Sequence, residues 1–499
     1  MTAAPIHPLS SAGQSTATES WQVRLAFSLL SAIVLGAALF VLAPALLQDP
    51  DSWWHVRTGQ DMLATRTFPT VDTYSYTFAG HPWIAKEWLA QIFLALAYDG
   101  AAWNGVALLT AATLLLTVFL LCRQLSEALK PVVAFGLALV LTFLIDGIFT
   151  ARPHIFTLPI AVVWTASLFR AARADRAPPF RLLALLWLWT NLHATFTLGF
   201  VVAAFAGLDF LVRNRFTKPS LLAKWCLFGA LCPVISLFNP YGLKAILATF
   251  TVAYGNEAVP YLTEWQPFNA AGDPLHEAAL LAMAFGLLAS GLRIGWPRAL
   301  FVLFALHLYL THQRFSYVFF LLVPLVLAQD VAEQFPALST QSWIREKRDG
   351  LERLLLRHHK YLSAAMAAVL VCGFVVFAAS RQIEPGQKTS ARNALAFAAQ
   401  QGLSGRVLNS YDFGGTLIFH GIKTFIDGRT DQLFLDGFTQ ADEDMGNSAG
   451  RPLLEAQLEK YAIDWALLSS NDRRIPFFDE LPRWKRVYSD PYAVIYIRG

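Results

Sequence analysis

Charged residues are scarce in this sequence: Asp, Glu, Lys and Arg make up 15% of its 499 residues, whereas 55% are hydrophobic. A soluble globular chain usually carries about 25% charged residues, so this composition excludes that class and favours a membrane protein. The formal net charge is only +4. Such a small basic excess argues against nucleic acid as a partner.

Cysteine is also scarce, with four residues that all fall in or beside apolar runs: Cys122, Cys226, Cys232 and Cys372. These positions exclude a disulfide framework in outside loops and a cysteine-based zinc cluster. The sequence has no Walker loop, no GxGxxG turn after a strand and no GxSxG turn. Any reaction must therefore draw its free energy from the substrate itself.

Apolar runs dominate the sequence, and about eleven of them are predicted to span the membrane, although several are shorter than the roughly 20 residues that a spanning helix needs. They predict an α-helical polytopic membrane protein. The runs cover residues 25–47, 106–121, 132–148, 155–168, 182–190, 197–212, 221–237, 278–292, 299–310, 317–328 and 361–379.

Basic residues gather in alternate loops between these runs, for example in 170–181, 213–224 and 345–360. Because Lys and Arg accumulate in cytoplasmic loops, the N-terminus is predicted inside and the tail outside. The predicted order is a cytoplasmic tail (1–24), a transmembrane domain (25–331) with its first outside loop at 48–103, a cytoplasmic basic linker (332–360), a last transmembrane helix (361–380) and an extracytoplasmic domain (381–499).

The final segment has a different pattern, which predicts a small α/β domain. Strands are expected at 406–411, 415–419, 424–426, 464–468 and 493–497, and helices at 391–400 and 453–461. The charged stretch Phe425 to Asp431 follows one of these strands. It suits either a ligand-binding edge or a loop of solvated charges.

Three carboxylates in the first outside loop are candidate catalytic groups: Asp51, Asp49 and Glu87. A carboxylate close to the membrane can take the proton from an acceptor hydroxyl that attacks a lipid-borne sugar. Each also has a plainer interpretation. Asp51 suits the N-cap of a helix that begins at Ser52, and Glu87 suits the first turn of the next helix.

Basic and polar residues at other outside span ends are candidates for binding substrate or phosphate: Arg152, His154, Asn191, His193, His312 and Arg314. Guanidinium groups bind phosphate oxygens in a bidentate fork, although Arg152 and Arg314 also suit a role as snorkelling anchors. The turn from Asn191 to Thr195 joins two short spans and is expected at membrane depth, as a cavity floor or as a packing turn.

The first loop carries the motifs Asp49-x-Asp51-x-Trp53-Trp54-His55, Asp72-Thr73-Tyr74 and Lys86-Glu87-Trp88, and others follow at 151–154, 189–193, 239–242, 264–267 and 425–429. Together they resemble a group of bacterial multi-pass proteins similar to the C-type glycosyltransferase (GT-C) superfamily. That superfamily includes protein mannosyltransferases, the oligosaccharyltransferase catalytic subunit and lipid A aminoarabinose transferases. The resemblance covers most of the chain.

The resemblance implies a GT-C-like bundle in the bacterial cytoplasmic (inner) membrane, with a catalytic acid in the first outside loop. The implied donor is a sugar on a polyprenyl phosphate or diphosphate, and the implied acceptor is an envelope glycan, lipid or protein beside the membrane lipid. Some members use a divalent metal, and Asp49 and Asp51 form a pair of oxygen ligands that suits Mg²⁺ or Mn²⁺. A lysine at position 86 argues against a metal ligand there.

The sequence thus predicts a membrane glycosyltransferase. A transporter or flippase of a lipid-linked saccharide is the main alternative, and it would place polar residues along a path through the midplane rather than at one face. A non-catalytic scaffold for polysaccharide assembly is the third interpretation.

The charge pattern predicts the topology directly. Alkaline phosphatase fused after Arg381 should be active in a bacterial host, because the enzyme folds only outside the cytoplasm. An inactive fusion, with an active cytoplasmic reporter at the same point, would contradict both the span count and the outside face.

Overall fold

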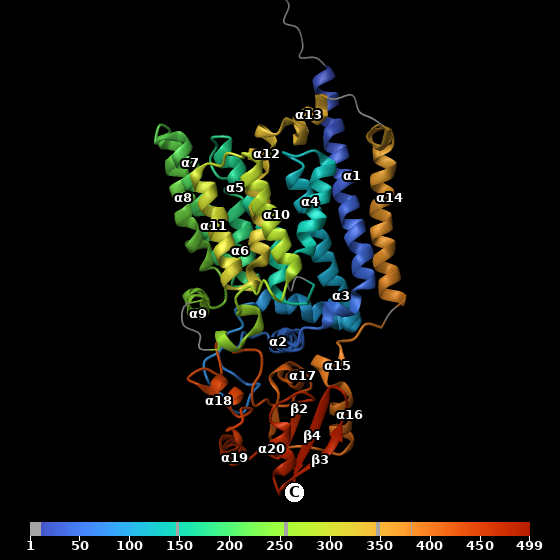
Figure 1. The fold of residues 1–499 in the computed structure, drawn as a ribbon, viewed down its shortest axis with the longest axis vertical. Coiled ribbons are helices and arrows are strands. Elements are labelled where there is room, and N and C mark those ends of the chain that lie inside the picture. The colour runs from blue at the N-terminus through green and yellow to red at the C-terminus, as the bar shows by residue number, and fades with distance from the viewer. Residues whose placement is uncertain (1–10, 146–148, 254–257, 346–349, 381) are drawn as a thin grey trace, which may run out of the picture.

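The computed structural model describes residues 11–145, 149–253, 258–345, 350–380 and 382–499. It is mostly helical and has two parts, a helix bundle and a smaller part at one end of the bundle (Figure 1). The smaller part, residues 387–498, contains both helices and strands and is called the mixed part below. The first loop (48–103) lies between the two parts, with α2 (Asp51–Thr65) directly below the bundle. Residues far apart in the sequence therefore meet at this junction.

Among the described residues, six apolar helical stretches are long enough to cross a membrane. They are Trp21–Val41 in α1 (Ser11–Val41), Trp88–Leu125 (α3), Pro153–Arg173 with α5 (Leu158–Arg173), Phe196–Asn214 (α7), Pro219–Ser236 (α8) and Gln313–Gln334 with α12 (Val323–Gln334). Shorter apolar helices are α4 (Pro131–Phe143), α6 (Leu182–Leu192), α10 (Pro274–Ser290), α11 (Trp296–Thr311) and Tyr361–Phe377 in α14 (Gly350–Ser380). The bundle is thus that of a multi-pass membrane protein, and the count of eleven crossings stays a prediction.

The sequence explains where several of these helices begin and break. Proline stands in the first turn of α4, α5, α8, α10, α11 and α12, where its missing N–H costs no hydrogen bond. In α3, Ala101 and Ala102 have non-helical backbone angles, so the helix is kinked before its most apolar half. The segment from Trp88 to this kink runs at the junction, and the predicted span 106–121 follows the kink.

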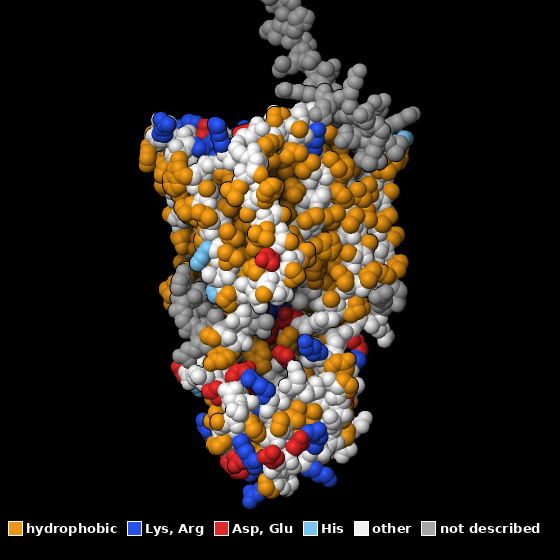
Figure 2. Space-filling model, in the orientation of Figure 1, with side chains coloured by type: hydrophobic (Ala, Val, Ile, Leu, Met, Phe, Trp, Pro, Cys, Tyr) orange, Lys and Arg blue, Asp and Glu red, His pale blue; other side chains and the backbone are white. Residues whose placement is uncertain are grey.

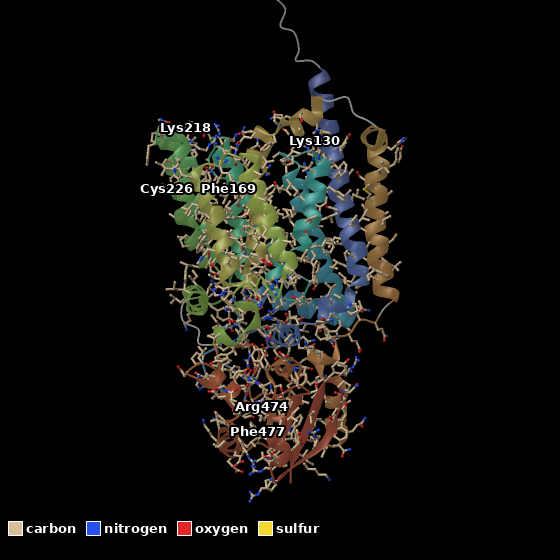
Figure 3. All side chains as sticks on the ribbon, in the orientation of Figure 1. Lys130, Phe169, Lys218, Cys226, Arg474 and Phe477 are labelled. Atoms are coloured by element: carbon tan, nitrogen blue, oxygen red, sulfur yellow. The ribbon has the colours of Figure 1, made fainter. Side chains whose placement is uncertain are left out.

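Short segments connect the helices of the bundle at both of its ends. They are η1 (Ala43–Leu47), η2 (Pro153–Thr157), α9 (Leu243–Ala253), η3 (Val259–Tyr261), η4 (Thr263–Trp265), η5 (Gln313–Phe315), the π-helical turn η6 (Val318–Leu322), η7 (Pro336–Leu338) and α13 (Thr340–Arg345). Lys130 and Lys218 lie at the opposite end from the mixed part (Figure 3), where basic side chains line the rim (Figure 2). The two ends of the bundle therefore differ in charge.

The mixed part contains a four-stranded sheet with the order β1-β2-β4-β3. Its strands are β1 (Val407–Asn409), β2 (Trp465–Ser469), β3 (Trp484–Ser489) and β4 (Ala493–Arg498); β1 pairs with β2 in parallel, and the other pairs are antiparallel. Around it lie α15 (Gln387–Ser390), α16 (Arg392–Gln400), η8 (Tyr411–Phe413), α17 (Gly414–Phe419), α18 (Phe438–Asp444), α19 (Arg451–Lys460) and α20 (Ile475–Glu480).

Two of the expected strands are absent from these elements. Residues 415–419 form the helix α17, and 424–426 form only an isolated bridge from Thr424 to Ser75 of the first loop. The β-branched side chains in 415–419 suggested a strand, but tertiary packing decides otherwise. A side chain at Gly415 would overlap the carbonyl oxygen of Pro50, so the glycine allows α17 to lie directly against α2.

A buried ion cluster joins the first loop to the mixed part. Arg429 donates to Asp72 at 2.6 Å and to both carboxylate oxygens of Asp427 at 2.7 and 2.8 Å, and all three side chains have no exposed surface. The Arg429 guanidinium also lies over the rings of Tyr74 and Trp83. The sequence suggested a binding edge or solvated charges in this stretch, and burial excludes both roles for the side chains of Asp427 and Arg429.

This cluster yields a stability prediction. Arg429→Met should lower the free energy of unfolding by about 3–5 kcal/mol, because it leaves two buried carboxylates without their cation. Chemical denaturation of the detergent-solubilised protein, followed by tryptophan fluorescence, measures the loss. Arg451→Met is the matched control, since Arg451 pairs with Glu455 and Glu480 at the surface. Equal effects of the two substitutions would contradict a clamping role for Arg429.

Candidate active site at the junction

A cavity of about 690 Å³ lies where the bundle, the first loop and the mixed part meet. Figure 2 shows acidic and basic side chains gathered in the hollow between the two parts. Seven of the residues predicted from sequence line this cavity: Asp49, Asp51, Glu87, Arg152, His154, His193 and Arg314. The fold therefore gathers groups that are spread over 266 positions of the sequence.

Arg152 lies at the centre of the charges. Its side chain pairs with Asp51 and Glu264, and its Nε is 3.2 Å from Asp49 Oδ2. Arg152 precedes η2, whose first residue is Pro153, so its backbone is extended and the side chain leaves the helix end toward the cavity. One guanidinium thus serves three carboxylates and leaves few N–H groups for a ligand.

Asp51 is the first residue of α2 and is buried, but it is not the N-cap that the sequence allowed. The N-cap is Pro50, and the Asp51 side chain makes no capping hydrogen bond. Asp49 Oδ1 instead accepts from the Asp51 backbone N–H at 2.9 Å, and Asp51 Oδ1 accepts from Trp54 Nε1 at 3.0 Å. The carboxylate of Asp51 is therefore held toward the cavity by its neighbours.

Burial raises the pKa of Asp51 to about 7, against the lowering effect of Arg152 and with a further raising effect of Asp49. A proton acceptor works best when its pKa lies near the working pH. The environment of Asp51 therefore suits a group that accepts a proton near neutrality.

Glu87, which precedes α3, is the second acid of the cavity. Its Oε1 is 3.1 Å from His193 Nε2, and its Oε2 is 3.8 Å from His55 Nε2. Burial raises the pKa of Glu87 to about 7, and the neighbouring Lys86 acts in the opposite direction. Lys86 itself forms an ion pair with Asp431 of the mixed part. Two carboxyl groups that change charge near pH 7 thus share one cavity.

Arg314 occupies the other side of the cavity, in η5. Its Nη1 donates to Glu264 Oε1 at 2.9 Å, and its guanidinium lies 4.3 Å from the centre of the Trp265 ring. Burial opposes the charge of Glu264, but Arg152 and Arg314 outweigh it and hold the pKa of Glu264 at about 2. Glu264 is therefore a charged bridge between two guanidinium groups.

The mixed part supplies one wall of the cavity through Tyr411, Gly428, Thr430 and Asp431. The Tyr411 hydroxyl is 3.2 Å from Thr430 Oγ1. A side chain at Gly428 would overlap Asp51 Oδ1 and lie 3.1 Å from Trp54 Nε1, so the glycine permits this close approach. The sequence motif 425–429 signalled the region, but nothing in the pattern placed it against Asp51.

Two predicted residues lie outside the cavity lining. Asn191 Oδ1 accepts from Trp88 Nε1 at 2.8 Å, and its amide donates to the Trp187 carbonyl. His312 Nδ1 lies 2.7 Å from the carbonyl oxygen of Trp265. Both side chains support the residues around the cavity. Asp72 of the first-loop motif also lies outside the lining and belongs to the buried Arg429 cluster.

The carboxylates here do not fit a metal cage. Among the residues that the structure describes, no group of three or more His, Cys, Asp or Glu side chains is arranged to hold a metal ion. Asp49 and Asp51, the suggested Mg²⁺ or Mn²⁺ ligands, both face the guanidinium of Arg152, whose charge opposes a cation at the same place.

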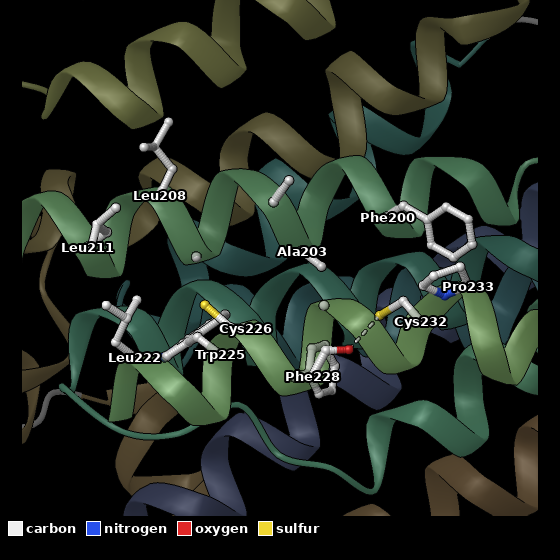
Figure 4. A pocket seen from close by; sticks show the side chains of 13 residues that line it. Phe200, Ala203, Leu208, Leu211, Leu222, Trp225, Cys226, Phe228, Cys232 and Pro233 are labelled. Carbon is white, nitrogen blue, oxygen red and sulfur yellow. Dashed lines mark hydrogen bonds between the residues drawn. The ribbon is translucent and has the colours of Figure 1, made fainter. Parts of the chain in front are cut away.

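An apolar groove of about 540 Å³ lies between α7 and α8 (Figure 4). Small residues that line the groove, including Ala203 and Gly229, keep this space between the two helices open. Phe200 lines both the groove and the polar cavity, so the two spaces adjoin along α7. An apolar chain in the groove would have its end near the charged groups.

No family model and no curated protein sequence matches this chain. Its structure is similar to that of the archaeal oligosaccharyltransferase AglB from Archaeoglobus fulgidus in complex with an inhibitory peptide and a dolichol-phosphate. The TM-score is 0.53 at 12% identity, over 89% of this chain and 69% of that one. The apo form of the Archaeoglobus fulgidus oligosaccharyltransferase gives a TM-score of 0.52 at 12% identity, over 95% and 74% of the two chains.

ArnT from Cupriavidus metallidurans in the apo state gives a TM-score of 0.50 at 13% identity, over 93% of this chain and 97% of that one. AglB and ArnT are polyprenyl-phosphate-dependent glycosyltransferases of the GT-C type. The likeness at this identity concerns the fold, and it confirms the resemblance drawn from the motifs: the chain is a multi-pass membrane protein with a GT-C-like fold.

Proposed function

We propose that the chain is a membrane glycosyltransferase that moves a sugar from a polyprenyl phosphate or diphosphate carrier to an envelope acceptor on the outer face of the bacterial inner membrane. The observation that carries the proposal is the buried Asp51 carboxylate beside Arg152, in a cavity at one end of an apolar bundle. The apolar groove beside the cavity suits the lipid part of such a donor.

The reaction would use Asp51 as the general base. Asp51 takes the proton from an acceptor hydroxyl while the hydroxyl oxygen attacks the anomeric carbon of the sugar. The new carbon–oxygen bond forms as the bond between the anomeric carbon and the carrier phosphate breaks. The phosphate leaves with the electron pair, and the guanidinium groups of Arg152 and Arg314 lie where they can stabilise its charge.

The wall formed by Tyr411, Gly428 and Thr430 belongs to the mixed part, and Gly428 brings it against Asp51. We assign this wall to the acceptor, because the lipid-facing groove adjoins the opposite side at Phe200. Under this assignment the sugar sits between the two, next to the carboxylate. The neighbouring Arg429 cluster then fixes the acceptor wall relative to the base.

Asp51→Asn tests the base directly. The amide keeps the shape of the side chain and can still accept from Trp54 Nε1, but it cannot take a proton. Transfer to the native acceptor should fall by roughly 10²–10⁴-fold at normal protein abundance. Asp61→Asn is the control, since Asp61 lies in the same helix and pairs with Arg57 away from the cavity. If Asp51→Asn and Asp49→Asn both keep wild-type transfer, the carboxylates are structural, and transport or scaffolding becomes the better assignment.

Gly428→Ala tests the contact between the wall and the base. The added methyl group must displace the Asp51 carboxylate, and a shift of about 1 Å can cost on the order of 10²-fold in rate. Gly386→Ala is the matched control, because Gly386 has open space around it. In an Asp51→Asn background, Gly428→Ala should cause little further loss, since the two changes act on one group. An equal loss in both backgrounds would show that Gly428 does not act through Asp51.

A further inference from the structure

Glu264 occupies an unusual position, because both of its carboxylate oxygens are bound by arginine. Oε2 accepts from Arg152 Nη1, and Oε1 accepts from Arg314 Nη1. The two arginines come from η5 and the start of η2, and Glu264 comes from η4, so three separate segments converge on one anionic group. Despite these contacts, 33% of the Glu264 side chain is exposed.

The partners of the two arginines differ. Arg152 also holds Asp49 and Asp51, which anchor it to the first loop. Among the described carboxylates, Arg314 forms an ion pair with Glu264 alone, and its guanidinium also stacks on Trp265. A planar guanidinium with one bound carboxylate and a stacked face is a typical arrangement for binding phosphate oxygens. Glu264 thus sits where such oxygens would fit.

We propose that Arg152 and Arg314 form a phosphate site that Glu264 occupies in the ligand-free protein, and that an incoming phosphate group takes the place of the Glu264 carboxylate. The inference rests on the proposed function, whose donor carries such a group. It adds that the Glu264 carboxylate competes with the donor phosphate for Arg152 and Arg314.

The charges around the site favour exchange over simple addition. The groups that face it are Asp49, Asp51, Glu87, Asp431 and Glu264 on the acidic side, and Lys86, Arg152 and Arg314 on the basic side. A phosphate added to this set would raise the repulsion among anions in a partly buried space. A phosphate that replaces the Glu264 carboxylate leaves the charge between the two guanidiniums nearly unchanged.

The exposure and location of Glu264 lower the free energy needed to release its carboxylate from the two arginines. A third of the side chain already faces solvent, and η4 is a three-residue turn rather than part of a packed helix. The carboxylate is ionised at neutral pH, since the two arginines hold its pKa at about 2. The competitor is therefore charged under the conditions in which a phosphate binds.

Direct binding of phosphate compounds to the full chain tests the inference. The protein is placed in nanodiscs of zwitterionic phosphatidylcholine and titrated with farnesyl phosphate, inorganic phosphate or farnesol. Tryptophan fluorescence reports binding, because Trp265 stacks on Arg314. Glu264→Gln removes the competing charge and should bind farnesyl phosphate about tenfold more tightly than the wild type. Glu277→Gln, at an exposed acid in the first turn of α10, should match the wild type.

The controls separate the sources of phosphate. Tighter binding of farnesyl phosphate alone identifies a lipid phosphate as the ligand, and equal tightening for inorganic phosphate identifies the phosphate group itself; both support the site. Tightening for farnesol, or binding that is equal or weaker in Glu264→Gln, would overturn the inference, because Glu264 would then only orient the arginines. Arg314→Gln should weaken binding in both backgrounds.

A second variant keeps the inference testable if Glu264→Gln does not fold. Glu264→Asp keeps the charge but is one methylene too short to span both guanidiniums, so it should bind farnesyl phosphate more tightly than the wild type by a smaller factor. Equal or weaker binding overturns the inference here as well.

Farnesyl phosphate carries no sugar, so the assay is independent of transfer. Tightened binding without any transfer overturns the proposed function alone, and normal transfer with unchanged binding overturns this inference alone.

Discussion

The charge balance around Arg152 is the constraint on which the junction depends. A single guanidinium pairs with Asp49, Asp51 and Glu264, which come from the first loop and from η4. Carboxylates this close together at the end of an apolar bundle would repel one another and lose hydration. Arg152 offsets both costs, and it leaves the pKa of Asp51 raised to about 7 because burial still dominates. The same cation thus allows three carboxylates to lie close together and lowers the pKa of Asp51 against the effect of burial.

The second constraint is that the mixed part closes the cavity. The buried Arg429 cluster fixes the loop after α17 against the first loop, and Gly415 and Gly428 let the backbone approach α2 without side chains in between. The core of the mixed part includes Trp54 and Trp83 of the first loop, so the two segments pack as one unit. The proposed acceptor wall of Tyr411, Gly428 and Thr430 is therefore held against the first loop.

Local sequence patterns and long-range packing disagree at specific places, and the packing prevails. The stretch 415–419 has the β-branched content of a strand, but it forms α17 because Gly415 fits against the Pro50 carbonyl. Asp51 has the sequence of an N-cap, but Pro50 takes that position and Asp51 turns to the cavity. The strand β3 (Trp484–Ser489) has no clear alternation and was not predicted. The deciding contact is long-range for α17, whereas Pro50 adjoins Asp51 and β3 pairs with the next strand, β4.

The sequence by itself determined that the chain is a multi-pass helical membrane protein and that its acidic groups gather in the first loop, because apolar run length and charge scarcity are local properties. It also indicated Asp51, Glu87, Arg152 and Arg314, since ionisable side chains at span ends are costly without a purpose. Only the tertiary structure decided that Glu264 bridges two arginines and that Tyr411, Gly428, Thr430 and Asp431 form a wall of the cavity. Those facts depend on which distant segments meet, and pairing between residues 50 or more positions apart leaves no periodic trace in the sequence.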